Sequence, residues 1–398
     1  MTNNSAESSM SEDSQPRTFP ETNLILIFGV TLMAIMGVSS ITPVFPMIMS
    51  EFHISKQEVG LLISFFTVPG VVFTPILGVL ADRWGRKKVL VPSLMLFGLA
   101  GGACAFARDF NVLLILRCFQ GLGAASLGTL NVAILGDLYT GKRRTAVLGY
   151  NMSVLSVGTA SYPAVGGLLA LFGIQYPFLL PLTAIPLGLL ILAFLKNPEP
   201  RNDQKIGMYM KNALSTLKSK QALGLFVVGM MSFVILYGAY FTYLPILIGG
   251  TFGVSPFIIG LIISASSATT VITSAKVGFL IRRYPEKKII LAGFALYALA
   301  LKIIPFVSIL VWFILPTLIF GIGTGMNVPC IQSLLTTQAP IKYRATFLSI
   351  YSTALRVGQT LGPIIMGMVS VVWGIEGVFF AGTVLSLLMV FITFVMIK

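Results

Sequence analysis

Residues 78–88 read Gly78-Val79-Leu80-Ala81-Asp82-Arg83-Trp84-Gly85-Arg86-Lys87-Lys88 and join two long apolar runs, 57–81 and 88–107. Both runs are long enough to cross a bilayer, so the stretch between them is predicted to be a short loop at a membrane surface. Five of its side chains are charged and four of those are cationic, which marks this surface as cytoplasmic. Gly85 permits a turn with positive φ.

The composition of the chain indicates a membrane protein. Of its 398 residues, 56% are hydrophobic and only 10% are charged, with a mean hydropathy of +0.92. Soluble domains carry about 25% charged residues. The apolar runs do not alternate in polarity as the strands of a membrane barrel do. We therefore expect an all-α polytopic membrane protein.

Twelve membrane spans are predicted from the apolar runs. The polar residues 1–21 are expected to be a disordered cytoplasmic tail without a signal peptide. Two six-helix halves, 22–196 and 221–398, are separated by a cytoplasmic linker at 197–220. The spans are expected at 24–49, 57–81, 88–107, 111–136, 144–171, 176–196, 221–248, 256–281, 289–306, 309–337, 345–371 and 375–397.

The lysines and arginines orient these spans. With the N-terminus inside, 21 of the 27 cations fall in predicted cytoplasmic segments. Only Lys56 and Arg108 fall in outer loops, and the other four lie within spans. This asymmetry predicts that both termini are cytoplasmic and that the protein lies in the cell (inner or plasma) membrane. The net charge of +14 is then explained by topology and contact with anionic lipid. Nucleic acid is not expected as a partner.

Few residues are suited to catalysis or metal binding. Cys104, Cys118 and Cys330 lie far apart in apolar runs, and His53 is the only histidine. Neither a disulfide framework nor a metal site is predicted from this spacing. No cofactor is implied, and the chain is not expected to be an enzyme.

The two halves are related by sequence at an offset of 200 residues. Gly60 and Ser64 recur as Gly260 and Ser264, and Pro163 recurs as Pro363. Glycines, prolines and cations repeated at one offset indicate a duplication, and an even number of spans per repeat makes the repeats parallel. Such duplicated halves around a midplane site are the architecture of alternating-access transporters.

The loop at 78–88 closely resembles the loop between helices 2 and 3 of the major facilitator superfamily of transporters. The simpler interpretation, a basic loop that only sets topology, does not explain Asp82 or the two glycines. The resemblance implies a cytoplasmic latch in which Asp82 faces the start of helix 11 and Arg86 pairs with Asp137. The second copy has Arg282 in place of Asp82. The predicted latch residues are Gly78, Asp82, Arg83, Gly85, Arg86 and Asp137.

Two further segments resemble motifs of the same superfamily. Arg117 occupies the place of a helix-4 arginine implicated in proton coupling; the alternative is an arginine that extends to the lipid surface. Span five resembles the helix-5 motif of drug:proton antiporters, with Tyr162 in place of a glycine. Its null hypothesis is helix packing alone. This motif and its copy comprise Gly149, Gly158, Pro163, Gly166, Gly167, Gly358, Gly362 and Pro363.

Arg356 is a mid-span cation outside these motifs, and it is predicted to bind an anionic group or to respond to proton-coupled change. Pairing with carbonyls or Gln359 is the structural alternative. None of the 13 acids lies mid-span, which disfavours a strictly cationic substrate and leaves Glu58 or Glu376 as fallback proton carriers. Helices 1, 4, 7 and 10 surround the pathway in the superfamily. The predicted cavity residues are Asn131, Tyr162, Tyr237, Tyr240, Phe241, Asn327, Gln332 and Arg356.

These observations favour a secondary active transporter of the drug:proton antiporter branch that exports apolar or amphipathic compounds in exchange for protons. The alternative is a transporter of an anionic or zwitterionic metabolite, sugar or lipid anchored by Arg356. A receptor or scaffold with this fold is a remote alternative. The expected partners are a small-molecule substrate, protons and membrane lipid, and the protein is expected to be a monomer.

Overall fold

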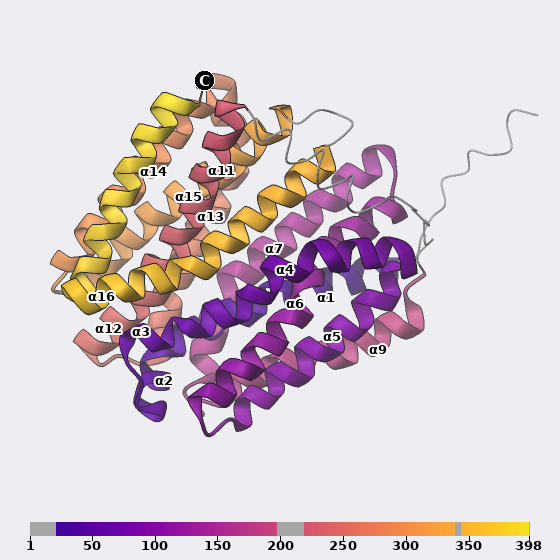
Figure 1. The fold of residues 1–398 in the computed structure, drawn as a ribbon, viewed down its shortest axis with the longest axis horizontal. Helices are drawn as coiled ribbons and strands as arrows, with labels where there is room; N and C mark the ends of the chain where they lie inside the picture. Colours follow the sequence, from indigo (N-terminus) through magenta and orange to yellow (C-terminus); the bar gives the residue numbers. More distant parts are fainter. Residues whose placement is uncertain (1–20, 197–218, 339–343, 398) are drawn as a thin grey trace, which may run out of the picture.

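The computed structural model describes residues 21–196, 219–338 and 344–397, and these residues form long helices (Figure 1). Almost all of the predicted tail (1–21) and of the predicted linker (197–220) lies outside the described residues. Eleven stretches of the described chain are long and apolar enough to cross a membrane. The expectation of an all-α membrane protein is therefore confirmed.

The helices of the first half, residues 21–196, follow the predicted spans closely. The first span combines α1, a 3-10 turn and α2, and the second combines α3 and α4. Their bounds are Glu21–Ser39 for α1, Phe45–Phe52 for α2, Lys56–Val59 for α3, Leu61–Trp84 for α4, Arg86–Ala103 for α5, Phe110–Leu138 for α6, Gly141–Leu169 for α7, Tyr176–Leu179 for α8 and Ala184–Phe194 for α9.

The second half, residues 219–397, contains one element that the apolar pattern does not predict. A π-helix, Val234–Tyr243 (η4), interrupts the seventh span between α11 and α12. Such segments occur frequently at functional sites. The α-helices of this half are α11 (Lys220–Phe233), α12 (Leu244–Phe252), α13 (Pro256–Arg283), α14 (Glu286–Ile303), α15 (Ile314–Gln338) and α16 (Arg344–Met396).

The predicted eleventh and twelfth spans are continuous in α16, which is why eleven candidate spans replace the predicted twelve. A straight helix of 53 residues would be roughly 80 Å long, far more than the roughly 30 Å hydrocarbon core. The backbone leaves helical geometry at Gly374, with φ 70° and ψ −176°. Figure 1 shows that α16 turns back on itself, with its orange first part and yellow last part forming two arms. Glycine adopts this positive φ without steric cost.

Two repeated lysines tie helix ends together in the same way in both halves. Lys87 Nζ, on α5, donates to the carbonyl of Leu195 just after α9, at 3.1 Å. Lys287 Nζ, on α14, donates to the carbonyl of Phe394 near the end of α16, at 2.9 Å. A cation at a helix C-terminus satisfies a free carbonyl and complements the helix dipole. The duplication seen in the sequence therefore recurs as equivalent local structure.

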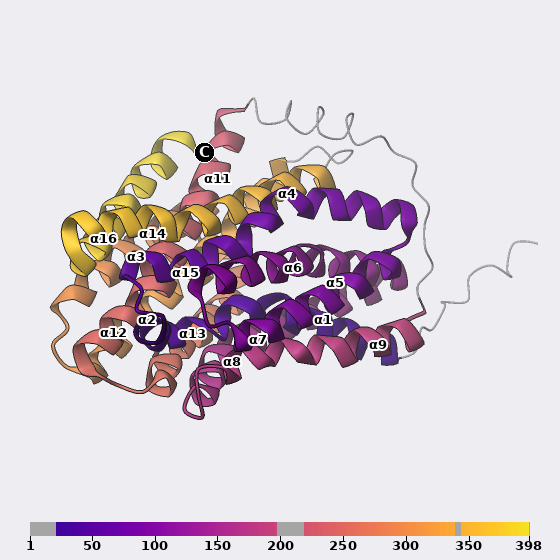
Figure 2. The same cartoon turned by 60° about the horizontal axis from the view of Figure 1, so that its bottom comes forward.

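The two halves pack along two pairs of helices. α4 lies against α16, and α7 lies against α13. Figure 2 shows α4 and α16 running side by side along one edge of the molecule. We call the end of the bundle that carries Arg83, Arg86 and Lys87 the basic end, and the opposite end the outer end.

Candidate functional site

The loop at 78–88 forms a clamp at the basic end of the first half. Gly85 separates α4 from α5 with a φ of 105°. This turn directs Arg86 toward Asp137 in the last turn of α6, and their Nη1 and Oδ2 atoms are 2.6 Å apart. Arg86 Nη2 also lies 3.6 Å from Asp82 Oδ1. The predicted pairing of Arg86 with Asp137 thus joins α5 to α6.

Asp82 and Gly78 lie at open positions in this conformation. The side chain of Asp82 is 47% exposed. Both ion pairs found among the described residues are formed by Arg86, one with Asp82 and one with Asp137, so both lie within the first half. A Cβ placed on Gly78 would meet no atom within 4 Å. Arg83 is also exposed. The contact between Asp82 and the start of α16 therefore stays a prediction.

Arg117 is enclosed within the first half and is only 1% exposed. Its Nε donates to Leu62 O of α4 at 3.3 Å, and its Nη1 donates to Gln120 Oε1 at 2.7 Å. The guanidinium carbon lies 4.4 Å from the ring centre of Phe66, while Nη2 has no hydrogen-bond partner. The side chain points into the protein, so it does not extend to the lipid surface.

Residues duplicated at the offset of 200 meet each other across the halves at the outer end. A Cβ on Gly60 of the first half would lie 3.1 Å from Pro363 Cβ, and a Cβ on Gly260 would collide with Pro163 O. Ser64 Oγ donates to Thr360 O at 2.8 Å. Its counterpart Ser264 accepts from the backbone N of Ala164 at 3.2 Å. We call these two related contacts the outer gate.

The outer gate continues inward along α4 and α16. The Thr67 and Thr360 hydroxyl oxygens are 2.7 Å apart. One turn further, the guanidinium of Arg356 lies over Gly70, where a Cβ would be 3.2 Å from its Cζ. Because Gly70 has no side chain, it leaves room for the guanidinium between the two halves. Sequence reasoning singled out Arg356 and the repeated serines, but no signal pointed to Gly70 or Thr360.

The glycines of the span-five motif and of its copy in α16 differ in how closely other atoms approach them. A Cβ at Gly166 would collide with the carbonyl oxygen of Ser40, and a Cβ at Gly167 would collide with that of Pro256. In the second half, a Cβ at Gly358 would collide with the carbonyl oxygen of Met230. A Cβ at Gly362 would lie 2.8 Å from the carbonyl oxygen of Val234. A Cβ at Gly158 would lie 2.6 Å from Ile35 Cδ1, while one at Gly149 would meet no atom within 4 Å. The glycines nearer the outer end therefore permit close backbone packing.

Several predicted cavity residues lie inside their own half. Asn131 Nδ2 donates to Thr31 Oγ1 at 2.8 Å, and the same hydroxyl donates to Asn151 Oδ1 at 2.5 Å. Tyr240 is buried and stacks on Phe320 at 4.2 Å between ring centres. Asn327 is buried against Gly293, where a Cβ would lie 2.7 Å from its Cγ. None of the three reaches the space between the halves.

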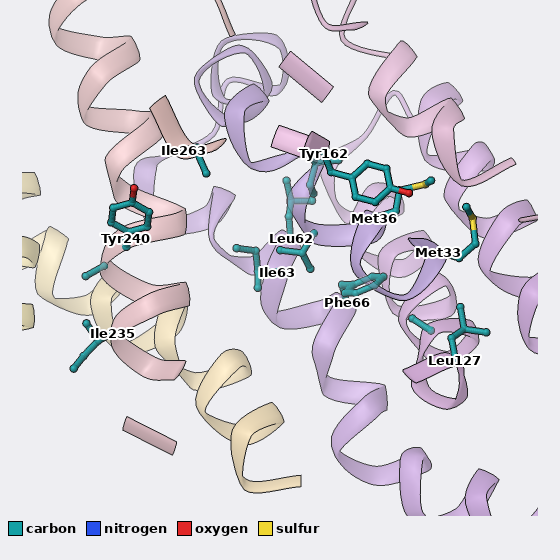
Figure 3. Packing of buried hydrophobic residues seen from close by; sticks show 14 of the residues in the cluster. Met33, Met36, Leu62, Ile63, Phe66, Leu127, Tyr162, Ile235, Tyr240 and Ile263 are labelled. Carbon is teal, nitrogen blue, oxygen red and sulfur yellow. The ribbon is translucent and has the colours of Figure 1, made fainter. Parts of the chain in front are cut away.

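The remaining predicted cavity residues range from buried to exposed. Tyr162 is 9% exposed and its ring is directed toward Met36, while Tyr240 lies apart in the second half (Figure 3). Gln332 is exposed, and Arg356, Tyr237 and Phe241 are half-buried. Phe233, which sequence analysis did not single out, has its ring centre 5.6 Å from that of Tyr237, and the ring centres of Tyr237 and Phe241 are 5.4 Å apart. Both ring pairs are tilted. These three rings and Arg356 are the group that the structure brings together.

The fallback proton carriers are both at the outer end. Glu58 forms a capping box with Ser55: its Oε2 accepts from Ser55 N at 2.7 Å, and its own N donates to Ser55 Oγ at 3.2 Å. Glu376 is exposed just after Gly374. Neither carboxylate reaches the space between the halves.

The contacts between the halves are concentrated at one end. The three hydrogen bonds between described residues of different halves involve Ser64, Thr67, Thr360, Ala164 and Ser264, all between the outer end and the middle of the helices. Toward the basic end, a Cβ added to Gly78 or to its copy Gly278 would meet no atom within 4 Å. The structure is therefore closed at the outer end, and at the basic end these two helix faces are uncovered.

Comparisons with known proteins agree with this architecture. The chain is 27% identical over 363 residues to the bacillibactin exporter of Bacillus subtilis, covering 86% of this chain and 88% of the relative. It is 28% identical over 277 residues to multidrug resistance protein 2 of Bacillus subtilis, covering 68% and 69%.

A solved structure shows the same fold. A bacterial homologue of the human lysosomal transporter Spinster, in an inward-facing and unoccupied conformation, matches with a TM-score of 0.81 and 17% identity over 95% of this chain and 97% of that one. The family profile of the Major Facilitator Superfamily matches residues 27–251 and 222–398. The chain therefore belongs to the Major Facilitator Superfamily, as a multi-pass secondary transporter and not an enzyme.

Proposed function

We propose that this protein exports apolar or amphipathic compounds in exchange for protons by alternating access. The relatives named above are a siderophore exporter and a multidrug resistance protein, and each is similar over two thirds or more of its length. The observation that carries the proposal is the closed outer end combined with the uncovered helix faces at the basic end. If the basic end is cytoplasmic, as the positive charges predict, compounds enter from the cytoplasm.

The outer gate has to open for release to the outside. Opening breaks the hydrogen bonds of Ser64, Thr67 and Ser264, each worth about 1 kcal/mol. It also separates the glycine contacts at Gly60 and Gly260. We propose that this loss is offset when Asp82 meets the N-terminus of α16 at the basic end, where the helix dipole favours a negative charge. The latch and the outer gate then form alternately.

Proton coupling in this proposal involves Arg117. Acids lie near the helix ends and not mid-span, so a buried cation is the strongest intramembrane charge available in the first half. Its Nη2 lacks a partner, which leaves one donor able to form a new bond when the halves rock. The protein would act as a monomer in the cell membrane, with both termini cytoplasmic and lipid at its basic loops.

The test is efflux of a panel of lipophilic dyes from proteoliposomes under an imposed pH gradient. Gradient-dependent acceleration is expected with the protein, and collapse of the gradient by a proton–potassium exchanger should abolish it. Arg117→Gln should retain dye binding and lose the acceleration, whereas Arg117→Lys should retain part of it. Dye efflux that is unaffected by the gradient would contradict proton exchange. Absence of any protein-dependent flux would favour the receptor or scaffold alternative.

A further inference from the structure

Arg356 is a cation without a counter-charge in the middle of the protein. It lies 12 residues into α16, about 18 Å along the helix from its start. Its guanidinium rests on Gly70 across the two halves, and it forms no hydrogen bond or ion pair with any described residue. It is half-buried and not enclosed. A charge at membrane depth normally has a partner, so this one is available to a ligand.

Three aromatic side chains follow one another along the seventh span, which packs against α16. Phe233, Tyr237 and Phe241 are half-buried, whereas Val234, Ile235, Gly238, Ala239 and Tyr240 between them are buried. A Cβ on Gly358 of α16, two residues from Arg356, would lie 3.1 Å from Phe233 Cβ. The Tyr237 hydroxyl lies within electrostatic range of Arg356. We call these three rings the aromatic column.

The aromatic column lies at and within the π-helix η4. In a π-helix the backbone bonds to the fifth residue along, so each turn holds more residues than in an α-helix. Thr242 Oγ1 donates to the carbonyl of Tyr237, five positions earlier, at 2.6 Å. Side chains four apart are neighbours on one side of the helix, as they are in an α-helix. The successive ring centres are 5.6 and 5.4 Å apart, within the range of favourable aromatic contact.

The groups that surround Arg356 do not neutralise it. Gly70 on α4 lies against its guanidinium, and the Tyr237 phenol on η4 interacts with it electrostatically. The described acids of α4, α6 and α16 are Asp82 and Asp137, near helix ends, and Glu376, just after the break in α16 at Gly374. A carboxylate, sulfonate or phenolate on a bound compound would supply the missing charge, and arginine binds such groups with paired hydrogen bonds.

We propose that Arg356 and the aromatic column form a binding site for an amphipathic organic anion with an aromatic ring. The acidic group pairs with the guanidinium, and the ring lies along Phe233, Tyr237 and Phe241. This deepens the proposed export function, on which it rests for its role in transport, by naming the class of compound carried. A neutral aromatic compound would use the column alone and bind more weakly.

Two fluorescent probes with the same aromatic frame separate these contributions. 1-Anilinonaphthalene-8-sulfonate carries a sulfonate, and N-phenyl-1-naphthylamine lacks it. Equilibrium titrations on the purified full chain need no gradient and no flux. Arg356→Gln is expected to weaken sulfonate binding at least tenfold and to change binding of the neutral probe less than twofold. Arg356→Lys should recover part of the loss, and Phe241→Ala should weaken both probes.

Lys302→Gln is the matched control, because it removes one positive charge from an exposed position in the last turn of α14. Circular dichroism and the melting temperature confirm that each variant is folded. Equal loss of sulfonate binding in Arg356→Gln and Lys302→Gln, or no loss in either, would overturn the proposed site. Arg356-dependent binding without any dye efflux would support the site and contradict the export function. If neutral dyes are exported but sulfonate binding does not depend on Arg356, the export function is supported and the proposed site is contradicted.

Discussion

Two buried guanidinium groups in the first half have partners of different kinds. Arg86 meets the carboxylate of Asp137 at 2.6 Å, so its charge is compensated. Arg117 meets only neutral acceptors and the ring of Phe66. A buried charge that has lost its hydration and meets no opposite charge raises the free energy of the folded state. The contrast supports a structural role for Arg86 and a proposed coupling role for Arg117.

The Arg86–Asp137 pair is expected to stabilise the basic end of the first half. Arg86→Gln and Asp137→Asn should each lower the free energy of unfolding by about 1–3 kcal/mol, because each leaves one charged partner with weaker hydrogen bonds. The double variant should lose little more than either single variant, since both remove the same interaction. Melting temperatures of the four proteins in detergent measure this coupling. Strictly additive losses would show that the two residues act independently.

At the scale of elements, the glycines of α7 are closely packed at one end of the helix and open at the other. Toward the outer end, Gly166 and Gly167 bring the backbone against Ser40 and Pro256, in the first and second half respectively. Toward the basic end, Gly149 faces open space. We infer that the outer glycines hold the closed gate, while Gly149 is available for the conformation in which the basic end closes.

A substitution pair on α7 tests this division. Gly166→Ala is expected to destabilise the protein by about 1–3 kcal/mol, because its Cβ would collide with the carbonyl of Ser40. Gly149→Ala should leave the melting temperature unchanged or slightly higher, because a Cβ there meets nothing and alanine favours helix. Thermal unfolding in the same detergent compares the two. A larger loss at Gly149 would contradict the packing contrast.

At the scale of the whole molecule, the duplicated halves meet through duplicated residues. The Gly60–Pro363 contact and the Gly260–Pro163 contact are related by the offset of 200, as are the hydrogen bonds of Ser64 and Ser264. The symmetry is incomplete, because Thr67, Thr360 and Arg356 extend only the contact between α4 and α16. Polar contacts between the halves therefore extend further inward between α4 and α16 than between α7 and α13.

A cross-link across the outer end tests the proposed alternation. A Cβ on Gly367 would lie 3.1 Å from Gln57 Cγ and 3.8 Å from its Cα, which is compatible with disulfide geometry. With Cys104, Cys118 and Cys330 replaced by serine, Gln57→Cys/Gly367→Cys should cross-link under mild oxidation. The cross-link should stop dye efflux, and reduction should restore it. Unchanged efflux in the cross-linked protein would show that the outer end does not open during transport.

The sequence predicted the candidate site only in part. The Arg86–Asp137 pair was anticipated because it follows from a motif with known spacing. Tyr240 and Asn327 were predicted in the cavity but are buried inside the second half. Phe233 was missed because it lies in an apolar run, where the sequence does not distinguish a ring that meets Tyr237 from one that faces lipid. Gly70 was missed because its role depends entirely on Arg356 of the other half.

By itself, the sequence determined a bundle of long apolar helices with a reversal of the chain near Gly374. In a bilayer each backbone polar group must be satisfied within the protein, so apolar length and charged loops are sufficient to define helices. Only the tertiary structure decided which helix faces meet across the halves and where they separate. Lipid and neighbouring helices are similarly apolar, so hydrophobicity does not distinguish these faces. Close backbone packing and a few polar contacts, from Ser64 to Arg356, make that distinction.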